Sequence, residues 1–187
     1  MTPLLLGGVA AAALLAATSI GRDASNPGPT PTPTPPFDYV GAIDPEVQIE
    51  AFLAVIRDGE SSDNYFSIVG GGSFIGYTKH PGLNSDDTIN KAFMPGAVSH
   101  ACGAYQFQPG TWLECKRALK LSDFGPEAQD AAAVFLLKRR GAYNAITSGN
   151  IGAAVDLVKN EWQMFVTPQW NIARVIGAFQ DYGGIVS

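Results

Sequence analysis

The chain has 187 residues, with 17 acidic and 12 basic side chains and a formal net charge of −5. This charge argues against nucleic acid as a partner and supplies no long-range attraction to an anionic glycan. No spacing among the two histidines and two cysteines matches a zinc-binding pattern, and the glycine run lacks the Lys-Ser/Thr of a phosphate loop. We therefore expect neither a metal nor a cofactor.

Residues 1–21 form an apolar segment in which no side chain from Thr2 to Gly21 is charged. Its length suits a cleaved signal peptide and also a signal anchor that stays in the membrane. Small residues at 17–19 favour cleavage, whereas the missing Lys or Arg at the start argues against an ordinary signal peptide. Both interpretations predict export, and the anchor predicts membrane contact through residues 1–21.

Residues 22–36 form a linker in which Pro-Thr pairs repeat. Such a composition is typical of an extended, semi-rigid tether, and a disordered spacer without a partner is the alternative. The remaining residues, 37–187, number about 150, which is enough for one hydrophobic core. We expect them to form a single, monomeric domain.

The first predicted helix begins after Asp44, a suitable N-cap, with Pro45 at the first helical position. Four apolar residues recur at the spacing of a buried helical stripe: Ile49, Phe52, Leu53 and Ile56. Glu60 lies eleven residues after Ile49, which returns it to nearly the same face of the helix. A carboxyl group in a partly apolar site has a raised pKa and can act as a general acid, although a solvated surface glutamate is the alternative.

The next segment, residues 65–77, places β-forming residues on both sides of a triple glycine and predicts a short hairpin. The rest of the chain predicts helices: one around Trp112, one over residues 126–140, one over residues 150–162 and a last one that starts at Thr167-Pro168. A small hairpin lobe beside a helical lobe gives an α+β architecture.

The order and spacing of several short motifs resemble the phage lambda endolysin family of the lysozyme superfamily. These motifs are Glu60 with Asp63-Asn64, Ile68-Val69-Gly70-Gly71, His80-Pro81, and Gly103 with Tyr105-Gln106. The resemblance covers roughly residues 51–162. It implies a lysozyme-like fold, with an active-site cleft between a mainly helical lobe and a small β-hairpin lobe, so residues 37–187 would be the catalytic domain.

The resemblance also implies cleavage of the β-1,4 bond between N-acetylmuramic acid and N-acetylglucosamine, with peptidoglycan glycan strands as the partner. Lambda-type enzymes are lytic transglycosylases in which one glutamate, here Glu60, does the acid and base work and a 1,6-anhydro ring forms. Asp63 offers an alternative, a hydrolytic muramidase with two carboxylates, although a turn-capping role suits Asp63 better. A glycan-binding or structural protein of a virion is a further alternative. For the free enzyme, export leads to the bacterial periplasm, where the chain is free or tethered to the inner membrane.

Four residues are candidates for holding the sugar: Asp63, Tyr77, Tyr105 and Gln106. Aromatic rings offer an apolar face with a polar edge, and a glutamine amide can both donate to and accept from acetamido groups. For Tyr105, a place in the core under the cleft is an equal alternative. Cys102 and Cys115 are the only cysteines, and an oxidising compartment favours a disulfide between them over two buried thiols.

Overall fold

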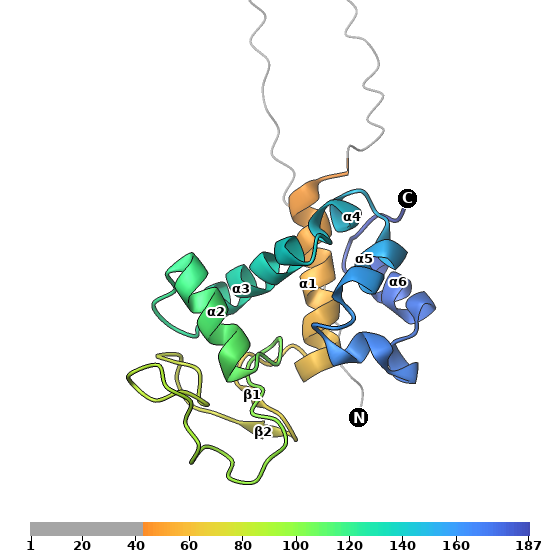
Figure 1. Cartoon of the computed structure of the whole chain (residues 1–187). Helices are drawn as coiled ribbons and strands as arrows, with labels where there is room; N and C mark the ends of the chain where they lie inside the picture. Colours follow the sequence, from red (N-terminus) through yellow and green to blue (C-terminus); the bar gives the residue numbers. More distant parts are fainter. Residues whose placement is uncertain (1–42) are drawn as a thin grey trace, which may run out of the picture. The chain divides into compact units, whose positions relative to one another are not determined.

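The structure is a computed structural model that describes residues 43–187 (Figure 1). Its first element is the long helix α1 (Pro45–Ser61), which begins as predicted: the Asp44 side chain accepts a hydrogen bond from the Glu46 N–H, at 2.9 Å. The helix ends because Ser62 adopts a left-handed conformation with φ of 55°. The predicted segments 1–21 and 22–36 lie outside the described residues.

The hairpin is present but short. Strand β1 (Ser67–Ile68) pairs in antiparallel register with β2 (Gly72–Ser73), so that Ser67 lies opposite Ser73. Gly70 and Gly71 make the turn with φ of 87° and 93°, a region that favours glycine. The prediction of a hairpin around the triple glycine is confirmed, with strands of only two residues each.

The remaining elements are helical. In chain order they are α2 (Pro109–Leu119), α3 (Pro126–Arg139), α4 (Tyr143–Thr147), α5 (Ile151–Val158), the 3-10 turns η1 (Gln163–Val166) and η2 (Pro168–Trp170), and α6 (Ile172–Asp181). Figure 1 shows α1 between the α2–α3 pair on one side and α4 to α6 on the other. This mainly helical arrangement with one small sheet is the predicted α+β architecture.

Two predicted helices have different bounds in the structure. The helix predicted over residues 150–162 ends at Val158, and Trp162 lies in the connection that follows. The helix predicted to start at Pro168 starts at Ile172, because extended Asn171 interrupts the chain and its side chain caps the Arg174 N–H, at 3.1 Å. The first correction places residues 159–162 in a connection, and the second places Pro168–Trp170 in the 3-10 turn η2, which precedes α6.

Aromatic side chains fill the core on both sides of α1. Phe52 stacks against Phe165 with ring centroids 5.8 Å apart, which holds η1 against α1. On the other side Phe124 packs edge-on against Trp112, with ring centroids 4.5 Å apart. Burial of such rings is a major source of folding free energy, so these contacts fix the elements that surround the end of α1.

A long connection without regular strands or helices, residues 74–108, joins the hairpin to α2. It is held at Cys102, which forms isolated antiparallel bridges with Ile68 and Phe107. Within residues 43–187, no helix combines the length and the apolar character needed to cross a membrane.

Candidate active site

Glu60 lies in the last turn of α1, and its carboxyl group is half-buried. Its Oε1 accepts a hydrogen bond from the Met164 N–H at 3.1 Å. Burial raises the pKa of Glu60 above its ordinary value, and the bond from Met164 offsets part of this rise. This direction agrees with the one expected from the helical spacing, and it means that a protonated carboxyl group persists to higher pH than in water.

The C-terminal elements approach Glu60 closely because the preceding residue is a glycine. A Cβ atom at Gly59 would stand in the space filled by the Met164 side chain and the edge of the Trp170 ring. The absence of that atom lets η1 and η2 pack over the end of α1. This packing places the Met164 N–H beside the half-buried carboxyl group of Glu60.

Glu60 lines three cavities of the described structure. The largest, of about 550 Å³, extends from Glu60 toward the ends of α3 and α5. A second, of about 380 Å³, lies between Glu60 and the hairpin residues 67–71. A third, of about 370 Å³, lies against Met164 and Trp170. The carboxyl group thus stands where a ligand that extends from one cavity to another would pass.

Gln106 is the one predicted sugar-binding residue that shares these cavities, since it lines the two largest. It adopts a left-handed conformation with φ of 49°, at the end of a tight turn in which its N–H donates to the Gly103 O at 3.2 Å. Its side-chain Nε2 donates to the same carbonyl at 3.0 Å. This local ring of hydrogen bonds orients the amide at the cavity wall.

The prediction that Tyr105 contacts the sugar is wrong in this structure. The side chain is 1% exposed, and its hydroxyl donates to Asp130 at 2.6 Å while it accepts from Arg57 at 3.0 Å. A ring enclosed in this way offers no face to a ligand. The alternative interpretation, a core residue under the cleft, describes Tyr105 correctly.

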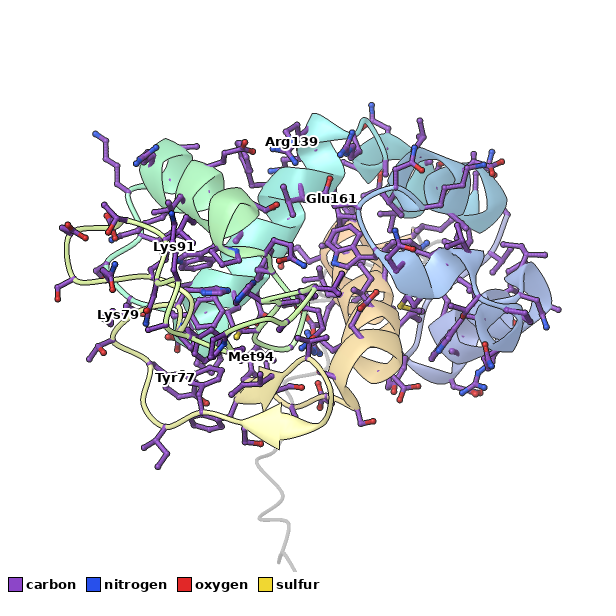
Figure 2. All side chains as sticks on the ribbon, turned by 60° about the horizontal axis from the view of Figure 1, so that its bottom comes forward. Tyr77, Lys79, Lys91, Met94, Arg139 and Glu161 are labelled. Atoms are coloured by element: carbon purple, nitrogen blue, oxygen red, sulfur yellow. The ribbon has the colours of Figure 1, made fainter. Side chains whose placement is uncertain are left out.

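Asp63 and Tyr77 lie outside the cavities that Glu60 lines. Asp63, two-thirds exposed, accepts a hydrogen bond from the Arg57 Nε at 2.8 Å and follows Ser62 in the left-handed region. Tyr77, labelled in Figure 2, stacks on Phe66 with ring centroids 4.3 Å apart. In this structure Asp63 stabilises the end of α1, and Tyr77 packs within the hairpin lobe.

The predicted disulfide is not formed in this structure. Cys102 and Cys115 are both free and buried. The Cys102 Sγ faces the His100 O at 3.7 Å, within the long connection, whereas the Cys115 Sγ faces the Ala132 O of α3 at 4.0 Å. Burial raises the pKa of Cys102 to about 12 and that of Cys115 to about 11. Both are protonated, unreactive thiols at neutral pH.

Four charged side chains that no sequence motif indicated as site residues line the largest of these cavities: Glu114, Arg139, Arg140 and Glu161. Arg139 bonds Glu114 at 2.6 Å and Glu161 at 3.2 Å, and Arg140 bonds Glu161 at 2.6 Å. These residues come from α2, the end of α3 and the segment after α5. Since no single periodic segment carries them, only the chain fold brings them together.

A half-buried glutamate at the end of a central helix, with cavities between a helical lobe and a small hairpin lobe, defines the lysozyme-like class of glycan-cleaving proteins. The family model described as Endolysin matches residues 50–186. The chain is 36% identical to the endolysin of Escherichia phage lambda over 124 residues. This matched region covers 62% of this chain and 75% of that protein. Against the endolysin of Escherichia phage P2 the identity is 34% over 90 residues, 48% of this chain and 53% of that protein.

Solved structures give the same result. The lysozyme from bacteriophage lambda matches with a TM-score of 0.64 and 31% identity, over 75% of this chain and 97% of the other. The bacteriophage lambda lysozyme complexed with a chitohexasaccharide matches with a TM-score of 0.63 and 32% identity over the same shares. The chain therefore belongs to the phage endolysin family and is a peptidoglycan-cleaving enzyme with the predicted lysozyme-like fold.

Proposed function

We propose that this endolysin cleaves the bond between N-acetylmuramic acid and N-acetylglucosamine as a lytic transglycosylase, with Glu60 as the one catalytic acid and base. One observation carries the proposal. Among residues 43–187, Glu60 is the only carboxyl group lining the cavities that makes no ion pair, since Glu114 and Glu161 are bound by arginines. Glu60 can therefore carry a proton, whereas the ion pairs with arginine favour the charged form of Glu114 and Glu161.

In this reaction one carboxyl group acts twice, first as the acid and then as the base. Glu60 donates its proton to the glycosidic oxygen while the bond from that oxygen to the anomeric carbon breaks and positive charge develops on the muramic acid ring. In substrate-assisted glycosidases the sugar's own 2-acetamido group stabilises this charge. The Glu60 carboxylate then takes the proton of the C6 hydroxyl, and the C6 oxygen bonds to the anomeric carbon. The product is a 1,6-anhydro ring, and Glu60 is protonated again.

The environment of Glu60 suits both halves of this cycle. Burial favours the neutral carboxyl group that starts the reaction, whereas the Met164 N–H favours the carboxylate that forms after the first proton transfer. A group whose pKa lies nearer the working pH exchanges protons more readily in both directions. For Gln106, the position on the wall of two Glu60 cavities supports a contact with the sugar's acetamido group.

The glycan as partner is supported by the related bacteriophage lambda lysozyme, whose structure was solved in a complex with a chitohexasaccharide. The hydrolytic alternative needs Asp63 beside the anomeric carbon. The bond from Arg57 to Asp63, at 2.8 Å, disfavours this role because it directs the carboxylate to the helix end. The binding-only alternative requires a chain that releases no product. A virion component is compatible with catalysis, and the presence of the protein in purified particles would distinguish it from a free enzyme.

Mass spectrometry of the fragments released from purified peptidoglycan tests the proposal. The full chain is compared with Glu60→Gln, which cannot donate the proton, and with Asp63→Asn as the matched carboxylate control. We expect anhydro-ended fragments from the wild type and from Asp63→Asn, and none from Glu60→Gln. Reducing ends that disappear in Asp63→Asn would establish the two-carboxylate hydrolase instead. A wild type that binds glycan without releasing fragments would leave a binding or structural role.

The composition of the N-terminal residues supports a further part of the proposal: residues 1–21 export the chain, residues 22–36 tether it, and residues 37–187 carry the activity. Fractionation of expressing cells, followed by mass measurement of the chain, tests this division. We expect the protein in the periplasmic or inner-membrane fraction, with a mass that shows whether residues 1–21 are retained. Recovery of the chain only in the cytoplasm or in purified virions would contradict it.

A further inference from the structure

Glu161 occupies an unusual place for a carboxylate, since its side chain is only 8% exposed although it lines the largest cavity. Its Oε2 accepts from the Arg140 Nε at 2.7 Å and from the Arg139 Nη2 at 3.2 Å. Figure 2 shows the Glu161 and Arg139 side chains close together at the end of α3. Charged hydrogen bonds from two arginines to one enclosed carboxylate are strong and directional.

This cluster does not form a free anion site. Its two arginines are balanced by two glutamates, and Arg139 divides its donors between Glu114, at 2.6 Å, and Glu161. An anionic part of the substrate would have to displace one of these carboxylates. The cluster is better explained as an ion-pair link, here called the fastening, which joins the end of α3 to the segment after α5, about twenty residues further along the chain.

The part of the chain that Glu161 fastens is the one that contacts the acid. Residues 160–164, here called the clasp segment, begin after α5 and end at Met164, whose N–H donates to the Glu60 Oε1 at 3.1 Å. Within the same segment the Trp162 Nε1 donates to the Tyr105 O at 3.2 Å. We propose that Glu161 is a positioning residue, which holds the clasp segment against Glu60 through Arg139 and Arg140.

The consequence for catalysis follows from geometry. The clasp segment lines cavities beside the Glu60 carboxyl group and supplies its one backbone donor. Loss of the fastening lets the segment move outward, so that water reaches Glu60 and the Met164 N–H withdraws. Because catalytic groups work only in a narrow range of positions, a displacement of about 1 Å lowers the rate by up to roughly a hundredfold.

The inference rests on the proposed role of Glu60, and its test is designed so that the two can fail separately. The variant Glu161→Gln keeps the shape of the side chain and removes its charge. The second variant, Arg140→Met, removes a partner from the α3 side and leaves Glu161 in place. Asp156→Asn is the matched control, since it breaks an exposed ion pair with Lys159, of 2.9 Å, just before the clasp segment. Each full chain is assayed for fragment release over a range of pH, and its thermal unfolding is recorded.

We expect Glu161→Gln and Arg140→Met to lower kcat by roughly ten- to a hundredfold, with a smaller change in KM, while Asp156→Asn retains wild-type kinetics. The alkaline limb of the pH profile should move to lower pH in both fastening variants, because hydration of Glu60 outweighs the loss of the Met164 bond. Unfolding profiles that remain cooperative show that the variants fold.

Two outcomes would overturn the proposal: wild-type kcat in both Glu161→Gln and Arg140→Met, or an alkaline limb that does not move in these variants. If Glu60→Gln keeps full activity, the proposed function fails first, whatever the Glu161 variants show.

Discussion

The buried imidazole of His80 makes the stability of this endolysin depend on pH. The ring is 0% exposed, its Nδ1 accepts from the Gly82 N–H at 3.0 Å, and its Nε2 lies 2.8 Å from the Phe107 O, where it donates. Burial lowers the pKa of His80 from 6.5 to about 4. Protonation of Nδ1 would also turn an acceptor into a donor that faces the Gly82 N–H.

Proton linkage sets how much the free energy of unfolding changes with pH. Between pH 6.5 and about pH 4 the unfolded chain binds a proton at His80 that the folded chain excludes, so the free energy of unfolding falls as the pH falls. The slope is about 1.4 kcal/mol per pH unit. From neutral pH to pH 5 the expected loss from this residue is therefore about 2 kcal/mol. Above the ordinary pKa of histidine the contribution is constant.

Urea unfolding at several pH values between about 7 and 5 measures this effect, since most carboxylates stay ionised in that range. The test variant is His80→Gln, whose amide can donate to the Phe107 O and cannot titrate. His100→Asn, at the only other histidine, is the control. The wild type and the control should lose about 2 kcal/mol more than His80→Gln on acidification. Parallel stability curves for all three proteins would show that His80 does not titrate in this way.

Three further predictions concern the core. A reducing agent should leave the Tm of the full chain unchanged, and thiol titration after denaturation should find both Cys102 and Cys115; a lower Tm on reduction would show a disulfide. Gly103→Ala should destabilise by more than about 2 kcal/mol in urea unfolding, because φ is 83° and a Cβ would overlap Gln129; near-wild-type stability would contradict the turn. Trp162→Phe removes a donor to a buried carbonyl and should cost about 1–3 kcal/mol, and a loss of well under 1 kcal/mol would argue against that bond.

Local sequence patterns were sufficient for the start of α1, for the hairpin and for the face on which Glu60 lies. Each depends on residues within a few positions of one another: Asp44 caps the next turn, and the apolar stripe recurs along one helix. The triple glycine marks its own turn because φ above zero is unfavourable for other residues. The family resemblance, carried by short motifs in order, added the lysozyme-like fold and the peptidoglycan substrate.

Patterns were insufficient where two interpretations had the same local signal. An aromatic residue followed by glutamine is compatible with a sugar-binding surface and with a place in the core. For Tyr105 the bonds of its hydroxyl to Arg57 and Asp130 show that the ring belongs to the core. Two cysteines thirteen positions apart suit a bridge or two thiols, and the position of Cys115 against α3 decides for thiols. In both cases the deciding partner lies on another element.

The periodic elements and the acid at the end of α1 can be read from local sequence, because helical spacing and turn geometry are properties of neighbouring residues. The surroundings of that acid depend on how the elements pack in space. The Met164 N–H reaches Glu60 across 104 positions, and Arg140 reaches Glu161 across 21. Burial and charge pairing depend on distances in space, and packing of the helices, which no single segment encodes, sets those distances.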